Sequence, residues 1–115
     1  MQEIFLLGLE AFHKGDYYNA HEYWEELWSD YHIEDRQFIQ GLLQLSVSFF
    51  HIQNGNLNGA KGLIDKSIEK FRNYTGFHRN IDVNSLKKQM VIIQEKYQKM
   101  SQPSEFDWDL IPELI

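Results

Sequence analysis

Two side chains capable of acid–base chemistry lie four residues apart in an aromatic-rich stretch of the sequence. These are His21 and Glu25, which share one flank if the segment is helical and can reach a single point. Further along, Gln40, Gln44 and His51 fall on one side of the next predicted helix, opposite its apolar face. We therefore predict that the two polar sides meet as one site between the second and third helices.

One interpretation of this site is functional. Two imidazoles and a carboxylate, from His21, His51 and Glu25, suit a first-row divalent metal. Trp24 and Trp28 would then form an aromatic wall that excludes water from a bound ligand. The protein would in that case be an enzyme that acts on a small molecule or depends on a metal, with its site between the second and third helices.

The other interpretation, which we favour, is a buried network of His, Glu and Gln side chains that fixes the helices relative to one another. Buried polar groups must be paired, since an unsatisfied donor or acceptor costs about 1–3 kcal/mol. Trp24 and Trp28, at helical spacing, are then core residues. On this view no cofactor or metal is expected, and we lean towards a protein that is not an enzyme. Histidines in the predicted turns, such as His78, are expected to be exposed.

Apolar periodicity predicts an all-α fold of about five helices. The third helix is apolar around most of its circumference, which places it at the centre of the domain. The fifth helix is capped by Asp82 or Asn84 and follows a connector of turn-forming residues. The predicted helices cover residues 2–13, 16–30, 35–53 and 56–72, with the fifth ending near residue 100.

A repeat of forty residues organises the first four helices. Gly15-Asp16, followed by Ala20, recurs as Gly55-Asn56, followed by Ala60. Glycines and alanines at such positions resemble those of tetratricopeptide units, in which Gly ends one helix and Ala lets the next approach closely. We therefore predict two tetratricopeptide-like antiparallel hairpins followed by a C-terminal helix and an ordered tail.

Domain organisation follows from the same pattern. Residues 1–100 form a single domain, and residues 101–115 form an acidic tail. This tail contains Phe106 and Trp108 among its apolar residues, so we expect it to pack on the domain or on a neighbour. A helical interaction or ligand-binding module is the function that this architecture favours, with a protein partner or self-association as possibilities.

Several blocks of the sequence together are similar to a known family. They are AHEYWEELW at 20–28, QGLLQLS at 40–46, GNLNGA at 55–60 and YTGFHRNIDVNSLKKQM at 74–90, together with His51. In these blocks the chain resembles the domain-of-unknown-function family numbered three hundred and nine. The resemblance implies an all-helical domain of roughly five helices, and it implies no established activity.

Composition excludes several classes of protein. A net charge of −6 opposes binding to nucleic acid, which depends on Lys and Arg displacing counterions. The absence of cysteine rules out disulfides and thiolate chemistry and is compatible with a cytoplasmic or organelle-interior location. Glu3 and Glu10 interrupt the N-terminal apolar run, so we expect neither a signal peptide nor a membrane span.

The two interpretations of the polar site differ in a measurable way. If the network is structural, His51→Leu should destabilise the protein less than Trp28→Ala, because the indole contributes far more packing area. Thermal melts of the two variants test this. A large loss of ligand binding in His51→Leu at unchanged stability would instead support the functional interpretation.

Overall fold

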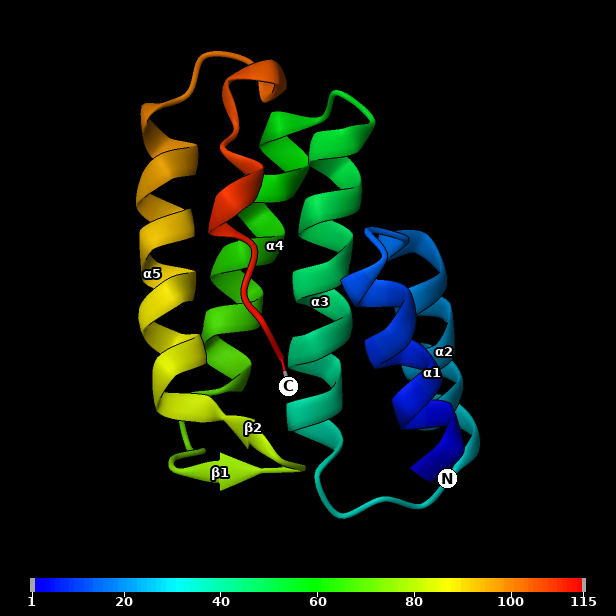
Figure 1. Cartoon of the computed structure of the whole chain (residues 1–115). Coiled ribbons are helices and arrows are strands. Elements are labelled where there is room, and N and C mark those ends of the chain that lie inside the picture. Colours follow the sequence, from blue (N-terminus) through cyan, green and yellow to red (C-terminus); the bar gives the residue numbers. More distant parts are fainter. Residues whose placement is uncertain (1, 115) are drawn as a thin grey trace.

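The computed structural model describes residues 2–114 and confirms the all-α class (Figure 1). Within these residues the chain forms five α-helices, a short β-hairpin and two 3₁₀ turns. The helices are α1 (Gln2–His13), α2 (Tyr17–Asp30), α3 (Arg36–Gln53), α4 (Leu57–Lys70) and α5 (Val83–Lys99). The remaining elements are β1 (Phe77–His78), β2 (Ile81–Asp82), η1 (Pro103–Glu105) and η2 (Trp108–Leu110).

The two copies of the repeat end and begin their helices in the same way. Gly15 and Gly55 have φ of 77° and 78°, a left-handed conformation that glycine adopts without steric cost. The following residues are N-caps: Asp16 accepts a hydrogen bond from the Asn19 backbone N–H at 3.2 Å, and Asn56 accepts one from Gly59 at 2.9 Å. The sequence repeat is thus a repeat of helix-terminating geometry.

Helix α3 lies at the centre, as its broad apolar face predicted. It packs against α2 on one side and α4 on the other, while α1 covers α2 and α5 covers α4. Its buried residues are Phe38, Ile39, Gly41, Leu42, Leu45, Ser46, Ser48, Phe49 and Ile52. No helix among residues 2–114 has the length and apolar character needed to cross a membrane.

The connector before α5 is a small antiparallel hairpin. Phe77 pairs with Asp82 and His78 with Ile81. Its two turn residues, Arg79 and Asn80, have positive φ of 49° and 64°, as a two-residue hairpin turn matching the twist of the strands requires. Asp82 then caps α5 by accepting a hydrogen bond from the Ser85 N–H at 3.1 Å.

The C-terminal segment folds back along the helices of its own chain. We refer to residues 101–114 as the strap. In Figure 1 it is the orange-to-red ribbon that follows α5 and descends in front of α4, between α5 and α3. Phe106 and Leu114 are buried, at 6% and 1% exposure. The strap therefore completes the hydrophobic core.

Close approach of α1 and α2 depends on Gly8. A Cβ atom at this position would lie 2.2 Å from Nε1 of Trp24, whose ring is fully buried. We expect Gly8→Ala to lower the free energy of unfolding by about 1–3 kcal/mol, because the helices must separate to admit the methyl group. Gly62→Ala is the matched control: a Cβ added there would meet no atom of the surrounding residues within 4 Å, and removing a glycine from the interior of α4 should stabilise the protein by about 0.5–1 kcal/mol. Urea denaturation measures both, and equal effects would contradict this account.

Candidate functional site

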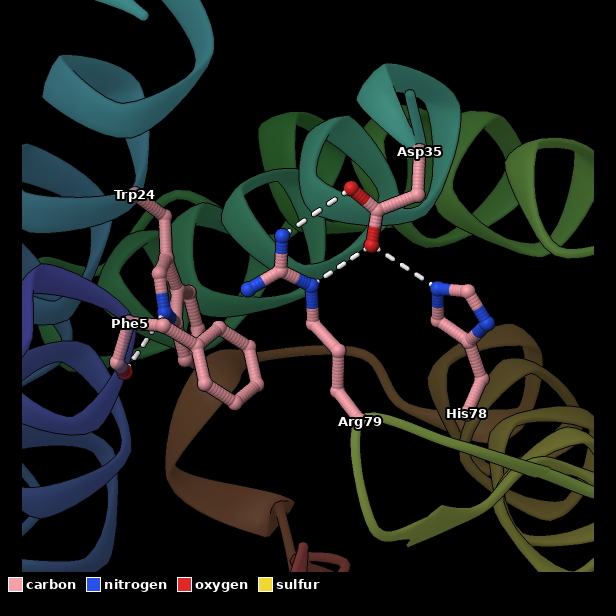
Figure 2. A network of polar contacts seen from close by, with 5 residues as sticks. All are labelled: Phe5, Trp24, Asp35, His78 and Arg79. Carbon is pink, nitrogen blue, oxygen red and sulfur yellow. Dashed lines mark hydrogen bonds and ion pairs between the residues drawn. The ribbon is translucent and has the colours of Figure 1, made fainter. Parts of the chain in front are cut away.

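A cluster of three charged or polar side chains joins the start of α3 to the β-hairpin. The carboxylate of Asp35 accepts hydrogen bonds from Nε of Arg79 at 2.6 Å and from Nη2 at 3.0 Å. It is also bonded to Nε2 of His78 at 2.8 Å (Figure 2). We call these three residues the clasp.

Asp35 gives up helix capping to take part in the clasp. It occupies the N-cap position of α3, but its side chain makes no capping hydrogen bond, in contrast to Asp16 and Asn56 on α2 and α4. A bidentate contact with a guanidinium is charge-assisted and stronger than a bond to a neutral amide. The carboxylate therefore turns towards the hairpin.

Aromatic side chains surround the cationic half of the clasp. The guanidinium of Arg79 lies 4.7 Å from the ring centre of Phe5, a cation–π distance. The backbone carbonyl of Phe5 in turn accepts a hydrogen bond from Nε1 of Trp24 at 3.2 Å. Figure 2 shows the Phe5 ring lying between Trp24 and Arg79. Through Phe5 and Asp35 the hairpin is thus joined to both α1 and α3.

The imidazole of His78 is also packed rather than solvated. Its ring centre lies 4.4 Å from that of Phe38 on α3 and 5.1 Å from that of Tyr74. The expectation that His78 is exposed in a turn was wrong, because the ring is half-buried, with 32% of its side chain accessible. No local pattern could have shown this, since its partner Asp35 lies 43 residues earlier.

Two opposing effects act on Asp35. Burial raises the pKa of its carboxyl, because only 13% of the side chain is exposed. The hydrogen bonds from Arg79 and His78 favour the charged form and outweigh burial, so the pKa lies below its ordinary value of 3.8. Asp35 is consequently a fixed anion at neutral pH.

A surface pocket of about 550 Å³ opens beside the clasp. This volume is within the range typical of small-molecule sites. Its lining comes from the first turn of α1, the α2–α3 loop and the hairpin, and mixes charged, amide and apolar groups. The lining residues are Gln2, His32, Ile33, Glu34, Asp35, His78 and Arg79.

The polar residues singled out in the sequence lie outside this pocket, on α2 and α3. His21 and Glu25 are paired, with Nε2 2.7 Å from Oε2, and their side chains are 22% and 55% exposed. His51 instead faces α4, where its Nδ1 lies 3.5 Å from Nδ2 of Asn56. Gln40 is half-buried.

Aromatic side chains of α2 and α3 contact each other beside His21 and His51. The ring centre of Tyr18 lies 6.0 Å from His21 and 5.5 Å from Phe50, which is 6.3 Å from the ring of His51. Within residues 2–114 no three His, Cys, Asp or Glu side chains are grouped so that they could hold a metal ion, so His21, Glu25 and His51 do not form such a site.

The two tryptophans proposed as an aromatic wall have different surroundings. Trp24 is completely buried in the core and is directed at α1 by its hydrogen bond to Phe5. Trp28 is partly buried and is covered by Arg36, whose guanidinium lies 4.3 Å from the ring centre. Each indole is therefore engaged by its own protein neighbours.

One residue of the predicted polar face, Gln44, has an unpaired hydrogen-bond acceptor among residues 2–114. Oε1 of Gln44 is buried and has no hydrogen-bond partner among residues 2–114. A buried acceptor in this state is costly and requires a donor from water or a ligand.

Comparison with known proteins identifies a family but no individual relative. Residues 5–63 match the family described as "Domain of unknown function (DUF309)". No curated protein matches the sequence.

Breaking the clasp should destabilise the fold. We expect Asp35→Asn to lower the free energy of unfolding by about 2–3 kcal/mol at neutral pH, because Arg79 would lose a charged acceptor in a largely buried place. The control is Glu69→Gln, which breaks an exposed Arg72–Glu69 pair on the surface and should change stability little. Chemical denaturation of the two variants gives the comparison.

The effect of Asp35→Asn should also depend on pH. Since the native pKa of Asp35 is lowered, its contribution to stability is complete above the ordinary value of 3.8 and is lost as the pH falls below it through the native pKa. The stability difference between the wild type and Asp35→Asn should therefore narrow in acid. A difference that stays constant with pH would show that the carboxylate charge is not what holds the clasp.

Proposed function

The chain belongs to the DUF309 family, and we propose that this member is a binding module for a small polar molecule, held in the pocket beside the clasp. The observation that carries the proposal is the position of Arg79 and His78. Both are fixed by Asp35, and both line a pocket of about 550 Å³. A pocket with convergent polar groups and a perturbed pKa is the usual mark of a ligand site.

The remaining hydrogen-bonding capacity of the clasp indicates the ligand's chemistry. Asp35 uses Nε and Nη2 of Arg79, while Nη1 is turned away from Asp35 in Figure 2. This nitrogen can donate to a carbonyl or carboxylate oxygen. The ligand we propose is therefore a small molecule that offers such an oxygen.

Binding, rather than acid–base catalysis, suits the state of Asp35. A general base should have a pKa near the working pH. The carboxyl of Asp35 has a lowered pKa and already accepts bonds from Arg79 and His78. It is suited to holding those two side chains in position and poorly suited to taking a proton.

A second candidate is the polar face of α2 and α3, which carries His21, Glu25, Gln40, Gln44 and His51. The unpartnered Oε1 of Gln44 favours it, since a ligand donor could satisfy that atom. The pocket remains our first choice because it offers a volume as well as polar groups.

We propose in addition that the protein works in the cytoplasm. Its lack of cysteine is compatible with a reducing compartment. Fluorescence imaging of the tagged protein in cells tests this location.

Backbone amide NMR distinguishes the two ligand sites. Titration with small carboxylates and amides should shift the amides of residues 32–35 and 76–80 in a saturable way, because these segments border the pocket. A ligand on the polar face would instead shift residues 21–25 and 44–51. If no compound changes the chemical shifts of residues 32–35 and 76–80, the pocket proposal is wrong.

A matched pair of variants sharpens this experiment. His32→Gln changes a lining residue outside the clasp, so it should weaken binding without changing the melting temperature. Lys66→Gln, on the exposed side of α4, should alter neither ligand affinity nor the melting temperature. Unchanged affinity in both variants would argue against the pocket.

A further inference from the structure

The strap forms nearly all of its backbone hydrogen bonds within itself. Its two 3₁₀ turns are closed by local bonds, such as Phe106 N–H to the Pro103 carbonyl at 3.1 Å and Leu110 N–H to the Asp107 carbonyl at 3.1 Å. Among residues 101–114 the one backbone bond to the helical body runs from Leu114 N–H to Nε2 of His13, at 3.3 Å. The strap is thus not tied into the fold by secondary structure.

Side chains hold the strap instead. The buried ring of Phe106 lies 5.4 Å from Tyr97 on α5 and 6.1 Å from Phe49 on α3, measured between ring centres. Trp108 stacks on Tyr17 with an interplanar angle of 14° and meets Phe106 edge-on at 4.9 Å. Two aromatic residues, separated by one residue, therefore anchor the segment in a groove formed by α2, α3 and α5.

The acidic residues of the strap shape the segment without touching this groove. Glu105 accepts hydrogen bonds from the N–H groups of Ser101 and Gln102, at 2.6 and 2.8 Å. Asp107 accepts one from the Asp109 N–H at 3.0 Å. All of these carboxylates are exposed, so their role is to cap the turns that present Phe106 and Trp108.

The start of the strap borders a surface hollow. A hollow of about 470 Å³ lies where the strap begins, between the α3–α4 turn and the first strap residues. It is lined by Ile52, Gln53, Gly55, Gln102, Pro103, Ser104 and Trp108. Half-exposed Trp108, at 41%, borders it.

We propose that the groove beneath the strap is a peptide-binding groove and that the strap is its resident, displaceable occupant. The partner is a protein segment with two aromatic residues separated by one acidic residue and followed by aliphatic residues. This is the pattern FDWDLI of residues 106–111, which the groove is seen to accept. Side-chain anchoring with few main-chain bonds permits exchange of one such segment for another. The inference is independent of the small-molecule pocket.

Covalent attachment makes the strap a strong competitor. A tethered segment acts at an effective concentration of the order of millimolar, so free peptide binds weakly until the strap is loosened. Weakening the strap's own anchors in the full-length chain should therefore expose the site.

The test uses a fluorescein-labelled peptide with the sequence of residues 101–115 and measures fluorescence anisotropy. Full-length Trp108→Ala should bind the peptide with a Kd at least about tenfold lower than the wild type does. Trp108 is suited to this because truncating a half-exposed ring disturbs the core little. A control peptide with Ala in place of both aromatic residues should bind neither protein.

Hydrogen exchange of the wild type tests displacement without any substitution. The amides of Phe106, Leu110 and Leu114 should exchange at least about 100-fold faster than those in the middle of α3, by local opening of the strap. If the strap amides and the α3 amides exchange their hydrogens at one common rate, the strap is an integral part of the fold and the proposal is overturned.

Two further outcomes would also overturn it. One is the absence of saturable peptide binding to Trp108→Ala when circular dichroism shows that this variant is folded. The other is a doubling of molar mass in light scattering of the wild type as its concentration rises, with the doubling lost in Trp108→Ala. That result would identify the occupant as the strap of a second copy.

Discussion

The burial of α3 is the constraint on which the rest of the structure depends. Helix α3 has α2 on one side, α4 on the other and the strap along a third. Few of its polar groups can therefore reach water. Ser48 and Ser67 show how the requirement is met: Ser48 donates to the Leu45 carbonyl at 2.8 Å, and Ser67 of α4 donates to the Gly41 carbonyl at 2.6 Å. The second bond also fixes the approach of α4 to α3.

The same constraint acts at the beginning of α3 and explains the clasp. The helix starts beneath the β-hairpin, so a charged N-cap there is largely removed from solvent and must have cationic partners. Arg79 and His78 supply them from the hairpin, and the left-handed conformation of Arg79 is part of the turn that brings them there. Asp35 thereby exchanges a local capping bond for long-range bonds that attach the hairpin to the helical body.

Features that depend on residues close together in the sequence could be predicted, whereas features that join distant residues could not. Gly15, Asp16 and Ala20, with their counterparts forty residues later, act within one or two helical turns, so their pattern predicted the two hairpins. The clasp joins residues 43 and 44 positions apart, and nothing near Asp35 or Arg79 indicates the other. The prediction that the polar sides of α2 and α3 meet as one site depends on how the two helices cross, which the spacing of residues along each helix does not specify. Tyr18 of α2 contacts Phe50 of α3 where the helices pack together.

The aromatic residues connect the two regions that we consider functional. Phe12 touches Trp24 on one side and Tyr17 and Phe49 on the other, with ring centres 5.3–6.1 Å apart. Trp24 is linked to Arg79 through their common contact with Phe5, whereas Tyr17 contacts Trp108 of the strap. Because these rings are close-packed, a shift at one end must be accommodated by neighbouring rings. The cover that Trp108 gives to Tyr17 is part of the burial that raises the pKa of this tyrosine to about 12. Displacement of the strap would remove the contact of Trp108 with Tyr17 and so expose part of this tyrosine to water.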